Sequence, residues 1–196
     1  FVLQEKAYDV AREHARAIED LHAAGHIDSP LHGLLLRAWS YFAAKEWKAA
    51  HPVWTAVVAE SSKLVDGDQA THSERFQHTQ YVGVHGEVAF LAGYHAKAAV
   101  ILEDAIVRFA ALAEAAPKDR RIGIQLVIQL TELERVYGAL AAKEPARRAH
   151  WLGKQRAALI KAMDSLGPSE DDSNSRAGMR RRLQAQVNKL DEALGG

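Results

Sequence analysis

The stretch AWSYFAAKEWKAAHPVWTAV (residues 38–57) and the stretch GEVAFLAGYHAKAAVILEDA (residues 86–105) share one rhythm of small and large residues. In each stretch a small residue is followed, after a helix break, by a second small residue and by a bulky residue four positions later. The matching positions are Ala38 and Gly86, Ala50 and Ala98, Trp54 and Leu102, and Val57 and Ala105. Small residues let two antiparallel helices approach closely, and large residues fill the space beside them. The sequence therefore predicts a helical hairpin that is used twice, which favours a stacked array.

The composition limits the classes of function. The 196 residues suffice for one full core or one short array. The 25 Lys and Arg residues balance the 25 Asp and Glu residues, so the formal net charge is zero. Because nucleic-acid binding depends on clustered positive charge, a nucleic acid is not expected as a partner. The absence of Cys removes disulfides and thiolate ligands.

No apolar run approaches the roughly 18–20 residues that a membrane span needs, so we expect no membrane partner. The default expectation is a cytoplasmic protein. The chain starts at Phe1 rather than Met, which is compatible with an upstream signal sequence or domain.

Helical periodicity and breaker residues predict eight helices and no strand. The breakers include Gly93, Pro117 and the polar segment GPSEDDSNS (residues 167–175), which is predicted to be a loop. We expect one domain covering residues 1–196, made of an N-terminal packing helix (3–24), three hairpins (30–65, 71–116 and 118–166) and a C-terminal capping helix (173–194).

The small-residue pattern resembles the tetratricopeptide repeat, in which small residues occupy the helix crossings of each hairpin. Successive crossings at Ala50, Ala98 and Ala149 are 48 and 51 residues apart, whereas the standard repeat has about 34 residues. The resemblance is therefore to elongated arrays such as those of bacterial regulators. A third unit is weaker, because Tyr137, Leu140 and Ala149 fit it but Gly153 and Arg156 stand where a bulky and a small residue are expected.

This resemblance implies an all-α, right-handed stack of about three hairpins with a packing helix at one end and a capping helix at the other. It also implies a scaffold or adaptor without a cofactor or catalytic activity, which binds a protein or peptide in a concave groove lined by the first helix of each hairpin. Aligned on the crossing residue, the groove candidates are His32, Leu35, Trp39, Phe42, Gln80, Gly83, Glu87, Phe90, Thr131, Glu134 and Gly138. An exposed Trp39 beside Phe42 would be a natural anchor, because aromatic residues dominate binding hot spots. The competing interpretation is that both are core residues.

Two other classes of function remain open from the sequence. Glu74, His78 and His85 are spaced so that they share one helix face, and carboxylate and imidazole groups so placed can hold a metal or metal cofactor in a helical bundle. A second Glu-x-x-His motif to pair with Glu19-Asp20-Leu21-His22 is missing, which weakens the dimetal alternative. The other class is a structural homo-oligomer that uses an exposed stripe of the first or last helix.

Overall fold

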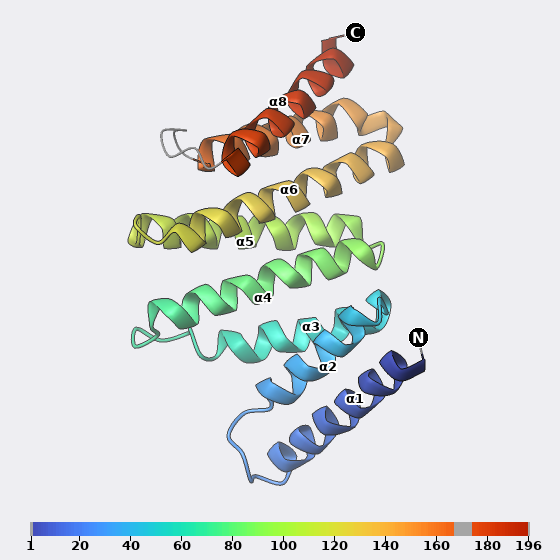
Figure 1. Ribbon diagram of the computed structural model, residues 1–196, viewed down its shortest axis with the longest axis vertical. Helices are drawn as coiled ribbons and strands as arrows, with labels where there is room; N and C mark the ends of the chain where they lie inside the picture. The colour runs from blue at the N-terminus through green and yellow to red at the C-terminus, as the bar shows by residue number, and fades with distance from the viewer. Residues whose placement is uncertain (1, 167–173, 196) are drawn as a thin grey trace. The chain divides into compact units, whose positions relative to one another are not determined.

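The computed structural model describes residues 2–166 and 174–195, and it confirms the predicted all-α class. Over these residues there are eight α-helices, one short 3-10 turn and no β-strand (Figure 1). The helices are α1 (Val2–Ala23), α2 (Leu31–Ala43), α3 (Trp47–Ser62), α4 (His72–Leu91), α5 (His95–Ala115), α6 (Arg120–Lys143), α7 (Arg148–Ser165) and α8 (Asn174–Gly195), with the turn η1 (Pro145–Arg147) before α7. Most of the predicted loop falls on residues 167–173, outside the described residues. None of the described helices combines the length and the apolar character that a membrane crossing requires.

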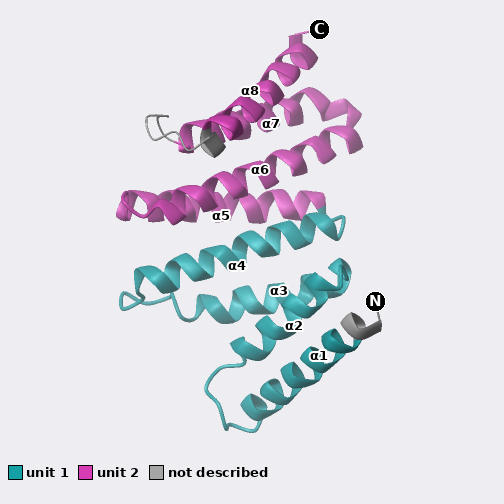
Figure 2. Ribbon diagram, viewed as in Figure 1, with its two compact units in different colours: residues 1–94 teal, residues 95–196 magenta. Residues whose placement is uncertain are grey.

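The chain divides into two compact units, Phe1–Tyr94 and His95–Gly196 (Figure 2). In unit 1, α1 packs on α2, α2 on α3, and α3 on α4. In unit 2, α5 packs on α6, α6 on α7, and α7 on α8. The helices α4 and α5, predicted as the two halves of one hairpin, thus belong to different units. The predicted packing helix α1 lies against α2, and the predicted capping helix α8 lies against α7.

The small and large residues of the first repeat form the core of unit 1. Ala38 of α2 and Ala50 of α3 are fully buried where these helices pack. Trp54 and Val57, on the same side of α3, are also fully buried and belong to the same apolar cluster. The prediction that small residues allow a close crossing and that Trp54 fills the space beside it is confirmed for this hairpin.

Two ion pairs and one ring contact hold α1 against the first hairpin. Arg12 pairs with Glu46, which precedes α3, at 2.9 Å, and its guanidinium lies 4.3 Å from the centre of the Tyr41 ring. Arg37 of α2 pairs with Glu19 of α1 at 3.1 Å. Because the arginine side chains of both pairs are largely covered, these contacts fix the register of α1 more firmly than exposed ion pairs would.

The two repeats also share one turn conformation. Lys45 follows α2 with φ of 60°, and Gly93, 48 residues later, follows α4 with φ of 88°. In both turns the next residue closes the helix end: Glu46 N–H donates to the Tyr41 carbonyl and Tyr94 N–H donates to the Ala89 carbonyl, each at 2.9 Å. This is the left-handed helix ending that glycine usually supplies. The sequence indicated it at Gly93 but not at Lys45.

The third hairpin departs from the repeat alignment. Gly153, aligned with the bulky positions Trp54 and Leu102, is exposed, and a β-carbon there would meet nothing within 4 Å. The bulky residues that α7 buries are Leu152 and Leu159 instead. The aligned small position holds Arg156, whose guanidinium pairs with Asp191 of α8. The mismatch that the sequence showed at Gly153 and Arg156 is therefore real: Ala149, aligned with the buried Ala50 and Ala98, is exposed, and the register of α7 differs from that of the first two repeats.

Gly33 allows the closest approach between α1 and α2. A β-carbon at this position would lie 2.8 Å from the carbonyl oxygen of Ala15, which is itself fully buried. We expect Gly33→Ala to lower the free energy of unfolding by about 1–2 kcal/mol, because the cost of overpacking against backbone exceeds the gain in helix propensity. Gly153→Ala is the matched control and should raise stability by up to about 1 kcal/mol, since the new methyl group meets open space. Urea denaturation of both variants measures the two effects, and a stabilised Gly33→Ala protein would contradict the close approach.

Candidate functional site

A row of five aromatic side chains crosses the three helices α2, α3 and α4 of unit 1. Its members, in order of contact, are Trp47, Phe42, Trp39, Trp54 and Tyr81. Successive ring centres lie 5.2, 5.3, 5.0 and 6.2 Å apart, and the first three contacts are edge-to-face. Such contacts are the preferred geometry of aromatic pairs and hold each ring in a defined orientation. We call this group the aromatic row.

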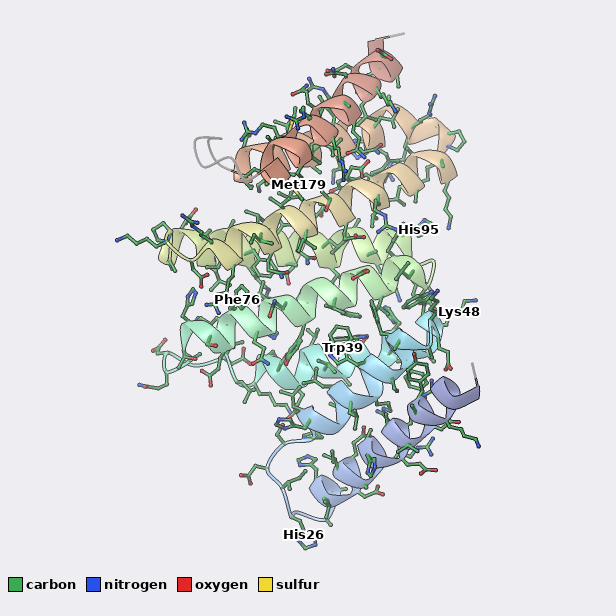
Figure 3. All side chains as sticks on the ribbon, viewed as in Figure 1. His26, Trp39, Lys48, Phe76, His95 and Met179 are labelled. Carbon is green, nitrogen blue, oxygen red and sulfur yellow. The ribbon has the colours of Figure 1, made fainter. Side chains whose placement is uncertain are left out.

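Trp39 is the exposed member at the centre of the row. Its side chain projects from α2 (Figure 3) and is 44% exposed. Its ring meets the ring of Trp54 at 90°, and Trp54 is 0% exposed. The Trp39 indole thus rests on a fully buried ring and presents its other side to solvent. This indole is preorganised for contact with a partner, because little side-chain entropy remains to be lost on binding.

Tyr81 brings a hydrogen-bonding group to the end of the row on α4. Its hydroxyl oxygen accepts a hydrogen bond of 2.7 Å from Nε2 of Gln77, one turn earlier. Partial burial raises the pKa of Tyr81, and the Gln77 bond opposes this in part. The phenol therefore stays protonated at neutral pH, and its hydrogen can be donated to an incoming carbonyl group.

The structure places the α2 groove candidates close together. Leu35 and Phe42 are half-buried and pack against the unit 1 core, Trp39 lies between them in sequence, and His32 is exposed in the first turn of α2. These residues and the aromatic row have no nucleophile or charged group among them. The surface is suited to binding apolar and carbonyl groups.

The α4 candidates occupy a neighbouring face of their helix. Gly83 is buried, and Gln80, Glu87 and Phe90 are half-buried. The α4 side chains that pack against the core cluster under Trp39 are Tyr81, Val84 and Val88. Alignment on the crossing residue did not select Tyr81. The signal that could have found it is its spacing of four residues from Gln77 and three from Val84, which places an aromatic ring on the face of α4 toward α3.

The three candidates from the third hairpin lie on α6 of unit 2. Glu134 accepts a hydrogen bond of 2.6 Å from Nε2 of Gln155 on α7, and a β-carbon at Gly138 would meet the same amide nitrogen at 3.2 Å. Thr131 donates its hydroxyl hydrogen within its own helix, to the carbonyl of Val127 or Ile128. Glu134 and Gly138 thus lie at the contact between α6 and α7.

The three residues of the alternative metal site, Glu74, His78 and His85, each contact a different hydroxyl-bearing residue. Glu74 caps α4: its carboxylate accepts from the Thr71 backbone N–H at 2.7 Å, and the Thr71 hydroxyl accepts from the Glu74 N–H. His78 contacts the Ser61 hydroxyl at 2.9 Å, and His85 contacts the Thr55 hydroxyl at 3.1 Å. In the described part of the chain, no group of three or more His, Asp or Glu side chains is arranged to hold a metal ion.

Comparison with known proteins adds little to these observations. No family model matches the sequence, and no curated protein matches it. A solved structure named "DHF58 filament" is 13% identical, with 99% of this chain and 100% of that chain covered, at a TM-score of 0.37.

Proposed function

We propose that this chain is a tetratricopeptide-like binding module, and that unit 1 binds a protein or peptide partner through the aromatic row. The single observation that carries the proposal is Trp39, exposed on one side and held edge-on by the fully buried Trp54 on the other. Trp and Tyr are the residues most enriched in binding hot spots, and here both occur in one connected group.

Two further features support a repeat-based scaffold. The buried small residues Ala38 and Ala50 lie inside the first hairpin, so that surface residues can vary without disturbing its packing. The left-handed turns at Lys45 and Gly93 recur at the repeat spacing. The partner contacts would combine apolar burial on Trp39 with a hydrogen bond from the Tyr81 hydroxyl.

Trp39→Ala tests the proposal. Peptides selected from a random display library against the full chain are expected to lose at least about 10-fold in affinity, since truncation of a hot-spot residue typically costs about 2 kcal/mol. The free energy of unfolding should fall by only about 1–2 kcal/mol, because half of the ring is already in water. Fluorescence anisotropy of the selected peptides and urea denaturation measure the two quantities.

Leu64→Ala is the matched control, because Leu64 is a large apolar residue of the same unit that is 50% exposed and lies beyond α3. It should leave the affinity of the selected peptides unchanged. Peptides that bind the Trp39→Ala protein as tightly as the parent would refute the anchor role. A large stability loss with unchanged affinity would instead identify Trp39 as a core residue.

A further inference from the structure

Three side chains from three helices of unit 2 meet in a polar cluster. The hydroxyl of Tyr137 on α6 donates to Oε1 of Glu103 on α5, and Nζ of Lys154 on α7 donates to the same oxygen at 3.0 Å. Burial and the Glu103 carboxylate both raise the pKa of Tyr137, so the phenol remains a donor. The Lys154 ammonium lies 5.3 Å from the centre of the Tyr137 ring and 5.7 Å from that of Trp151. This arrangement holds Lys154 in place by three contacts.

An apolar cavity of about 310 Å³ begins at this cluster. Its lining comes from α5, α6 and α7 and consists of Glu103, Ile106, Val107, Leu130, Leu133, Tyr137, Lys154, Ala157, Ala158 and Lys161. The volume is at the lower end of the range typical of small-molecule sites. Val107 in its wall is 67% exposed, so apolar surface is left uncovered there. A concave site with an apolar lining and a few polar groups at its ends is the usual form of a ligand pocket.

The charges at the two ends of the cavity differ. At the Tyr137 end, Lys154 is neutralised by Glu103. Lys161 also lines the cavity, seven residues further along α7, and it pairs with no carboxylate in the described ranges. Seven helical residues span about 10 Å. The cavity thus presents an unpaired ammonium group at one end, an apolar middle and a neutral, aromatic far end.

We propose that this cavity binds a small monocarboxylate with an apolar body about 10 Å long. The carboxylate pairs with the Lys161 ammonium, and the body covers Leu133 and Val107 and ends against the ring of Tyr137. The proposal is for binding alone, and the Tyr137 proton is already committed to Glu103. The site is in unit 2 and does not depend on the aromatic row of unit 1.

The test uses the full chain and three probes of equal chain length: octanoate, octan-1-ol and octylamine. Isothermal titration calorimetry should show octanoate binding at least about 10-fold more tightly than octan-1-ol, and octylamine most weakly, because only the carboxylate pairs with an ammonium. Lys161→Met keeps the apolar stem and removes the charge, so octanoate affinity should fall about 10-fold to the level of octan-1-ol. Ala157→Leu, at an exposed wall position, should weaken all three probes by filling the cavity.

Lys189→Met is the control, since Lys189 is exposed on α8 and does not line the cavity. It should bind octanoate as the parent does. The proposal is overturned if octanoate fails to bind at millimolar concentration, if Lys161→Met leaves its affinity unchanged, or if octan-1-ol binds as tightly as octanoate. Should Ala157→Leu fail to fold, the Lys161→Met result still decides the outcome, because that exchange alters only an exposed ammonium group.

Discussion

Replacing Trp54 by alanine is expected to lower the free energy of unfolding by about 3–5 kcal/mol. Trp54 is fully buried in the apolar cluster of unit 1, against Ala38, Val53 and Val57. The large loss has two sources. The variant lacks the free energy gained when the indole is transferred out of water on folding, and the helices α2, α3 and α4 cannot close around the cavity that remains. Because small domains are stable by only about 5–15 kcal/mol, the variant should be near the limit of folding. Urea denaturation followed by circular dichroism measures the loss.

Trp54→Phe is the informative companion variant. The indole nitrogen of Trp54 is buried, and no acceptor for it is found among the described residues. Phenylalanine keeps an aromatic ring in place and removes this unsatisfied donor, so its cost should be below about 2 kcal/mol. If Trp54→Ala lost less than about 1 kcal/mol, or less than Trp39→Ala, then Trp54 would not be the support of the aromatic row.

Acidification from pH 7 to pH 5 is expected to lower stability, and His85 should contribute up to about 2 kcal/mol of this loss. The pKa of His85 is lowered to about 4, first by burial and second by the nearby His51, whose ring centre lies 5.0 Å away. The Thr55 hydroxyl donates its only hydrogen to the His51 carbonyl, so His85 donates to Thr55 through Nε2. The lowered pKa keeps the His85 ring neutral in the folded chain at pH 7.

The direction of this pH effect follows from comparing the protonation of His85 in the unfolded and folded states. The unfolded chain protonates this histidine near pH 6.5, whereas the folded chain resists until about pH 4. Between these values the unfolded state binds more protons, so stability falls as the pH falls. Above about pH 7 the histidine is neutral in both states and contributes no pH dependence.

His85→Gln should remove most of this pH dependence, because glutamine can keep a hydrogen bond to Thr55 but does not titrate. His26→Gln, in the exposed loop after α1, should leave it unchanged. Chemical denaturation at a series of pH values from 7 to 5 gives the slope, in a range where carboxylates still contribute little. A parent-like slope in the His85→Gln protein would show that another group is responsible.

The sequence was sufficient for the helices because their ends carry local signals. Thr71 and Glu74 form a capping box at the start of α4, and Pro117 follows the end of α5. The first hairpin could also be predicted, because Ala38 and Ala50 are small enough for a close helix crossing and Trp54 is large enough to fill the space beside it.

The third hairpin shows where this approach fails. The alignment took Ala149 as the crossing residue of α7, but Ala149 is exposed, so the bulky position that it implied fell on Gly153 and not on the buried Leu152. The local period of Leu152 and Leu159, seven residues apart, identifies the buried face of α7 without reference to the other repeats. Local periodicity is thus the better guide for this hairpin.

Within the candidate site, the sequence predicted Trp39 beside Phe42 but not the contact of Trp39 with Trp54 or of Trp54 with Tyr81. The rotation of α3 and α4 about their own axes decides which rings meet, and that rotation depends on the whole interface between the helices. For the same reason the cavity beside Tyr137 left no trace in the sequence, because it requires residues 103, 137 and 154 to converge from three helices.

The paired turns at Lys45 and Gly93 bear on how such repeats diverge and how they can be detected. The same left-handed backbone conformation is adopted by a glycine in one repeat and by a lysine in the other. The same pair of backbone hydrogen bonds closes the helix end in both turns. The identity of the turn residue can therefore drift while the path is kept. Searches for related chains would gain more from the spacing of buried alanines than from a glycine signature, because the alanines are constrained by contact and the turn residue is not.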